Sequence, residues 1–163
     1  MNYTYYKLSI FEMLYQTMDI KLFFSGFFKL YLYWEYIVII STLGAILNSL
    51  VGVFSKKSFK TFDLRITLFS LIFNYIFLII GLFVFLSNFL FLFWDSNNKF
   101  IFEQNHFLFY MSTHLLNLIT VLILTIGWSL HKKSNISLKK FLRVLGFYFL
   151  GMIIIIWKFI WIN

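Results

Sequence analysis

The stretch Ile66–Trp94 reads ITLFSLIFNYIFLIIGLFVFLSNFLFLFW and contains no charged residue. As a helix it would be about 43 Å long at 1.5 Å per residue, whereas the hydrocarbon core of a bilayer is about 30 Å thick. A soluble domain of 163 residues has no interior large enough to hide such a helix on every side. The stretch therefore predicts a membrane-spanning helix that tilts or continues into the interface.

Three other apolar segments accompany this one. Hydrophobic residues make up 61% of the chain and charged residues only 12%, whereas soluble domains have about 25% charged residues. We expect an all-α integral membrane bundle over residues 30–163, with about four transmembrane helices at 32–54, 66–94, 107–130 and 141–161. Residues 1–29 mix apolar and polar positions at helical spacing, which predicts an amphipathic helix at the membrane surface or against a partner.

The composition points to an organellar genome. The chain has 24 Phe, no Cys, no Pro and a single Ala, Ala45. Helix packing in lipid does not explain this bias, because it favours Ala and Gly. AT-rich codons do explain it, which favours a mitochondrial gene over an AT-rich bacterium or parasite nucleus. We also see no import signal at the N-terminus.

The loops between the predicted spans alternate in charge. Residues 55–65 and 131–140 are strongly basic, whereas residues 95–105 carry a net charge of −1. By the positive-inside rule, the two basic loops face the matrix and both termini face the intermembrane space of a mitochondrial inner membrane. Because the cations sit at span ends, we expect no nucleic-acid partner. Four of them form a candidate headgroup site for phospholipid, with cardiolipin as the specific hypothesis: Lys56, Lys57, Lys60 and Arg65.

Small residues line one side of the first span and predict close approach by a neighbouring helix, in this chain or in a partner. They form two adjacent rows: Ser41, Ala45 and Ser49, then Gly44, Asn48 and Gly52. Polar residues in the later spans should face protein rather than lipid: Asn74, His114, Asn117 and Thr120.

Three charged side chains sit near predicted span ends. We favour a structural role for Glu35, at the headgroups or the helix N-terminus, over a proton-carrying one. Arg143 and Lys158 are expected to snorkel to the interfaces.

The sequence predicts no catalytic activity for this chain on its own. We find no phosphate loop, metal motif or nucleophile arrangement, so no catalytic or metal-binding residue is assigned. A haem on His114 would need a second His from a partner chain. We therefore favour a hydrogen-bonded interior or interface histidine, and we expect no cofactor.

Two segments carry a resemblance to a known family. Val38–Tyr75 has a span with Gly44 and Asn48, a basic turn at residues 55–57 and a second span; from Leu115 a third span contains LTIG at 124–127, followed by HKKSNISL at 131–138. This order resembles the 4L subunit of proton-pumping NADH:ubiquinone oxidoreductase (respiratory complex I), in a highly divergent form similar to mitochondrially encoded proteins of protists such as ciliates. The family carries buried glutamates in its second and third spans, where this chain has no acidic residue.

The resemblance implies a small, non-catalytic membrane subunit in the proton-pumping arm of complex I, bound to larger membrane subunits. Three alternatives stay open. The chain could be a structural subunit of cytochrome c oxidase or ATP synthase, a free-standing transporter or channel, or a haem-binding anchor of succinate dehydrogenase.

Overall fold

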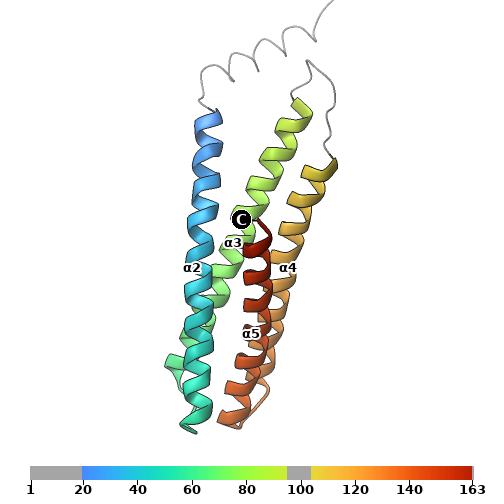
Figure 1. Ribbon diagram of the computed structural model, residues 1–163. Helices are drawn as coiled ribbons and strands as arrows, with labels where there is room; N and C mark the ends of the chain where they lie inside the picture. Colours follow the sequence, from blue (N-terminus) through green and yellow to red (C-terminus); the bar gives the residue numbers. More distant parts are fainter. Residues whose placement is uncertain (1–19, 95–103, 163) are drawn as a thin grey trace, which may run out of the picture.

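The described part of the molecule is a bundle of helices. The computed structural model describes residues 20–94 and 104–162, with side chains described for residues 26–86 and 111–160. This part contains no strand, and its helices are α2 (Ile20–Phe54), α3 (Thr61–Trp94), α4 (Gln104–Lys132) and α5 (Ser137–Ile162). They run up and down beside one another (Figure 1). Each packs on the next in the chain, and α5 closes the ring against α2.

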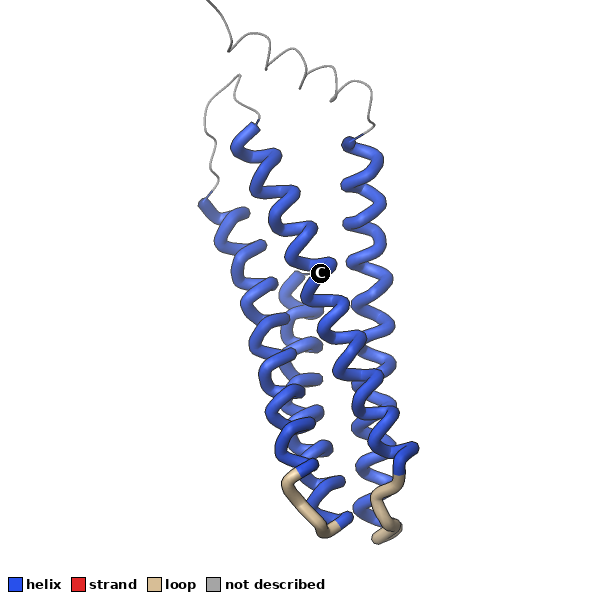
Figure 2. The backbone as a smooth tube through the Cα atoms, turned by 180° about the vertical axis from the view of Figure 1, so that it is seen from behind, coloured by secondary structure: helices blue, strands red, loops and turns tan. Residues whose placement is uncertain are grey.

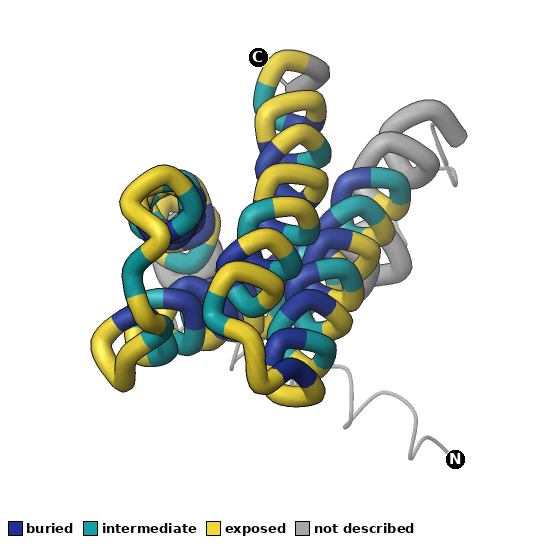
Figure 3. Tube along the Cα trace, turned by 90° about the horizontal axis from the view of Figure 1, so that it is seen from below, coloured by how far each residue is buried: buried dark blue, intermediate teal, exposed yellow. Residues whose placement is uncertain are grey.

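All four helices are long and apolar enough to cross a membrane, over Gly26–Phe54, Thr61–Leu86, Met111–Lys132 and Ser137–Ile160. The end view shows exposed positions on their outward sides and buried positions where they face one another (Figure 3). Large apolar side chains such as Ile40, Leu122 and Ile160 are exposed on this outer surface. Such a surface suits lipid rather than water. The predicted all-α, four-span membrane bundle is confirmed.

The first span is longer than the sequence pattern indicates. Its helix begins at Ile20 rather than at Leu32, so residues 20–29 belong to the same helix as the span, which itself begins at Gly26. Residues 1–19, the rest of the predicted amphipathic helix, lie outside the described residues. The helix ends at Phe54, and Lys56 follows with a φ of 48°, the left-handed conformation common just past helix C-termini.

The second span also begins earlier than expected, at Thr61. The cause is a cap: an Asp63 carboxylate oxygen accepts the backbone N–H of Lys60 at 2.8 Å. This contact satisfies one of the free N–H groups at the start of a helix and corresponds to half of a capping box.

Buried positions recur at alternating steps of four and three residues on every helix. We call these positions the inward stripes: 31, 35, 38, 42, 45, 49 and 52 on α2; 63, 67, 70, 74, 77, 81 and 84 on α3; 113, 117, 120, 124, 127 and 131 on α4; and 141, 144, 148, 151, 155 and 158 on α5. A repeat of 3.5 residues keeps one stripe facing the bundle axis along its whole length, as in left-handed coiled coils.

The interior combines apolar clusters with polar side chains. One cluster, nearer the short loops, includes Ala45, Leu71, Leu124 and Tyr148; the other includes Tyr31, Val38, Phe77 and Ile155. Figure 2 shows both short loops, residues 55–60 and 133–136, at the same end of the bundle. The two basic segments therefore share one side, as alternating loop charges require, and which compartment they face stays a prediction.

Candidate functional site

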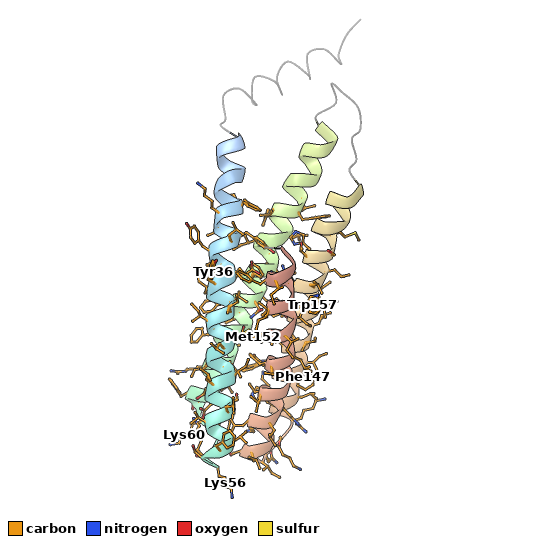
Figure 4. All side chains as sticks on the ribbon, viewed as in Figure 1. Tyr36, Lys56, Lys60, Phe147, Met152 and Trp157 are labelled. Carbon is orange, nitrogen blue, oxygen red and sulfur yellow. The ribbon has the colours of Figure 1, made fainter. Side chains whose placement is uncertain are left out.

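A buried ion pair joins α2 and α5, the first and last helices of the described part of the chain. Lys158 Nζ on α5 lies 2.6 Å from Glu35 Oε1 on α2, and the two side chains are 1% and 7% exposed. Their sequence neighbours Tyr36 and Trp157 lie on the outer surface of the same helices (Figure 4). The pair therefore sits inside the bundle, about one turn before the end of α5.

This location corrects two expectations. Lys158 does not snorkel to an interface, and Glu35 reaches neither headgroups nor the helix N-terminus, because α2 begins four turns earlier at Ile20. Position 35 and position 158 both fall on inward stripes and at the same level, so each charge finds its counter-charge inside the protein. Pairing replaces the solvation that the interface would otherwise provide.

The other two helices each place one side chain against the Lys158 ammonium: Asn117 on α4 and Phe77 on α3. Lys158 Nζ donates a hydrogen bond to Asn117 Oδ1 at 3.1 Å, and Asn117 Nδ2 donates to the Tyr31 hydroxyl at 3.1 Å. The ammonium also lies 4.3 Å from the centroid of the Phe77 ring on α3 and 5.6 Å from that of Tyr31. All four helices thus surround this cation. We call Glu35, Lys158, Asn117 and Tyr31 the charged network.

His114 lies beside the charged network. Its ring is 6.2 Å from that of Tyr31 and 5.3 Å from that of Phe85, centroid to centroid. A Cβ at Gly81 would come within 3.0 Å of His114 Nδ1, so this glycine makes room for the imidazole. His114 Nδ1 is buried and has no hydrogen-bond partner among the described residues. His114 therefore lies in the interior, as expected, but its Nδ1 atom does not make the expected hydrogen bond.

A second polar contact joins α2 to α3. The Thr42 hydroxyl accepts hydrogen bonds from the Ser70 hydroxyl at 3.1 Å and from Asn74 Nδ2 at 3.2 Å. All three side chains are buried. Thr120, the remaining member of the predicted polar set, is buried on α4 and donates to the Leu116 carbonyl of its own helix at 2.9 Å. The predicted polar residues therefore face protein, as Asn117 also does.

The small-residue face of α2 divides into two parts. Ala45, Ser49 and Gly52 are buried on the inward stripe, and a Cβ at Gly52 would overlap the ring of Phe141 on α5. The remaining three positions are only half-buried: Ser41, Gly44 and Asn48. A Cβ at Gly44 would have no atom within 4 Å. The neighbour that Gly52 admits is thus a helix of this same chain.

The charges of the first loop are partly neutralised within the chain. Lys57 Nζ lies 2.7 Å from Asp63 Oδ1 and 3.4 Å from Asn48 Oδ1. Lys56, Lys60 and Arg65 are exposed at the same end, and Figure 4 shows the first two near the loop that joins α2 to α3.

The sequence did not reveal Tyr31, Thr42 or Ser70 as members of polar contacts, nor the pairing of Glu35 with Lys158. A signal was present, because Glu35, Thr42 and Ser49 are spaced seven residues apart on a largely apolar helix. Polar residues at one heptad position are typical of an inward face.

The polar chemistry of the interior, within the described residues, is that of a buried ion pair and its hydrogen bonds. No group of three or more His, Asp or Glu side chains gathers as a metal site within the described ranges. His114 and His131 are about 25 Å apart along α4, too far to ligate one haem iron from its two sides. Comparison with known proteins gives no match to a family model, a characterised protein or a solved structure.

Proposed function

We propose that this chain is a small, non-catalytic membrane subunit of a mitochondrial respiratory-chain complex, and specifically of the proton-pumping membrane arm of NADH:ubiquinone oxidoreductase. The observation that carries the proposal is the ion pair of Glu35 and Lys158, 2.6 Å apart inside a membrane-spanning bundle. Ionisable residues within membrane spans are costly, and they are found mainly where a protein handles ions, protons or electrical charge. Energy-converting complexes are assemblies of this kind.

The packing of the bundle favours a subunit over a transporter that works alone. The inward stripes are filled by side chains from all four helices, with apolar clusters on both sides of the Thr42 contact. Transporters instead bind substrate at discontinuous helices near the membrane midplane. The helices described here run without interruption through their apolar segments. Such a bundle can form a wall beside larger subunits.

The same features would serve a structural subunit of cytochrome c oxidase or ATP synthase, and a native gel separates these assignments. Mitochondrial membranes solubilised in mild detergent should release this chain in the band that oxidises NADH. Mass spectrometry of that band, compared with the oxidase and ATPase bands, is the measurement. Recovery with the oxidase or the ATPase would replace complex I by that complex, and recovery as a free species would contradict the subunit assignment altogether.

Orientation gives a second test. Under the positive-inside rule, a protease added to mitoplasts, whose outer membrane has been opened, should cleave near Lys99 and spare Lys132 and Lys133. The control is the same digestion after detergent treatment, in which both sites become accessible. Cleavage at Lys132 or Lys133 in intact mitoplasts, with Lys99 protected, would reverse the proposed topology.

A further inference from the structure

We propose that an anionic phospholipid binds at the loop end of the bundle, with its phosphates in contact with cations from both short loops. The site combines cations of the two basic segments, residues 55–65 and residues 131–143. We call this region the basic end. It contains a single acidic side chain, Asp63, and the following cations: Lys56, Lys57, Lys60, Arg65, Lys132, Lys133, Lys139, Lys140 and Arg143.

Some of these cations already have partners in the chain. Lys57 pairs with Asp63, and Arg143 donates to the Leu130 carbonyl. The ammonium groups of Lys132 and Lys140 lie 5.0 Å and 5.6 Å from the centroids of aromatic rings. Five cations have no acidic or aromatic partner within the described residues: Lys56, Lys60, Arg65, Lys133 and Lys139. The basic end therefore carries positive charge that no acidic side chain of the described residues neutralises.

Aromatic contacts hold the two loops together. The Phe59 ring of the first loop lies 4.8 Å from Phe141 on α5 and 5.6 Å from His131 on α4, centroid to centroid. Lys57 Nζ lies over Phe141 at 5.4 Å, and Lys140 Nζ lies over Phe59 at 5.6 Å. These contacts place Lys57 and Lys140 beside the same pair of rings, Phe59 and Phe141. A single ligand with more than one anionic oxygen can contact both loops without either having to move.

Apolar side chains at the same end indicate lipid rather than an acidic protein. Phe54 is 79% exposed, Phe62 67% and Ile136 54%. Exposed rings and aliphatic side chains next to unpaired cations match the boundary between headgroups and acyl chains, where one molecule offers phosphate and hydrocarbon together. A soluble acidic partner would satisfy only the charges.

The inference does not depend on which complex holds the chain. The chain of 163 residues is placed in nanodiscs of phosphatidylcholine with a minority of cardiolipin. It is then extracted in mild detergent, and the retained lipid is measured by native mass spectrometry. We expect cardiolipin to be retained in preference to phosphatidylcholine, and an excess of inorganic phosphate should not displace it.

Variants assign the site. Lys56→Gln/Lys60→Gln/Arg65→Gln at the first loop and the start of α3, and Lys133→Gln/Lys139→Gln at the second loop and the start of α5, should each lower cardiolipin retention several-fold, and their combination at least tenfold. The matched control, Lys21→Gln/Lys29→Gln at the other end of α2, removes as many charges as the second-loop variant and should leave retention unchanged. Circular dichroism checks that each variant is folded, which glutamine at the exposed cations of the basic end should allow.

Three retention results would overturn the inference, and so would one displacement result. These are equal retention of cardiolipin and phosphatidylcholine, loss from only one of the two loop variants, and an equal loss from the control. The last would mean that net charge alone attracts the lipid. Displacement by inorganic phosphate would also count against it, because the site would then recognise a free anion.

Discussion

Replacing Lys158 with methionine should lower the free energy of unfolding of the bundle by about 3–5 kcal/mol. The substitution leaves the Glu35 carboxylate buried at 7% side-chain exposure with no counter-charge, and it removes the donor to Asn117. Glu35→Met should cost a similar amount, because it leaves the Lys158 ammonium unpaired in the same place. Unfolding by SDS in mixed micelles, followed by tryptophan fluorescence, measures the change.

The double variant Glu35→Met/Lys158→Met should recover most of the lost stability. Apolar side chains of similar volume often replace a buried ion pair at no net cost, because the desolvation of both charges is also removed. A matched control is Lys139→Met, an exposed lysine on the same helix, with an expected change within about 0.5 kcal/mol. If the double variant were as unstable as the two single changes combined, the charges would not be coupled.

Gly52→Leu should separate α2 from α5, at a cost of about 1–3 kcal/mol or more. A Cβ at this position would overlap the Phe141 ring, which is fully buried and packed against Phe59, so the ring has little room to move. Cross-linking between the two helices and SDS unfolding of the purified chain both report the separation.

Gly44→Leu is the internal control, because a Cβ there meets no atom within 4 Å. We expect the stability of the isolated chain to change by no more than about 0.5 kcal/mol. Gly44 was expected to share a packing face with Gly52, and within this chain it does not. If Gly44→Leu leaves the chain stable but prevents its incorporation into a larger complex, the half-buried side of α2 faces a partner. Equal destabilisation by both leucines would contradict the packing described here.

The four spans could be predicted from the sequence because they depend on local properties. Ile66–Trp94 is identified by its length and its lack of charge, and neither property needs knowledge of any other helix. The helix starts at Ile20 and Thr61 were missed for different reasons. Residues 20–29 contain polar positions that interrupt the apolar pattern, and Asp63 was counted as a loop charge although its role is to cap α3.

The charged network could not be predicted in the same way, because it depends on which helix faces which. On an isolated helix, the Lys158 ammonium would cost free energy inside the hydrocarbon core. The least costly arrangement of such a helix extends this side chain toward the interface. Only the register of α5 against α2 places Glu35 opposite it. Asn117 was recognised as polar and inward, but its two partners come from the first and last helices.

The ion pair also orders events during biosynthesis. Glu35 enters the membrane with the first helix, whereas Lys158 lies near the end of the last. Until α5 is made and inserted, the acidic side chain must stay protonated, hydrated or shielded by the insertion machinery. A ribosome that stops before codon 158 would release a product with an unneutralised glutamate in α2. The burial of Glu35 therefore becomes favourable only when α5 has taken its place beside α2.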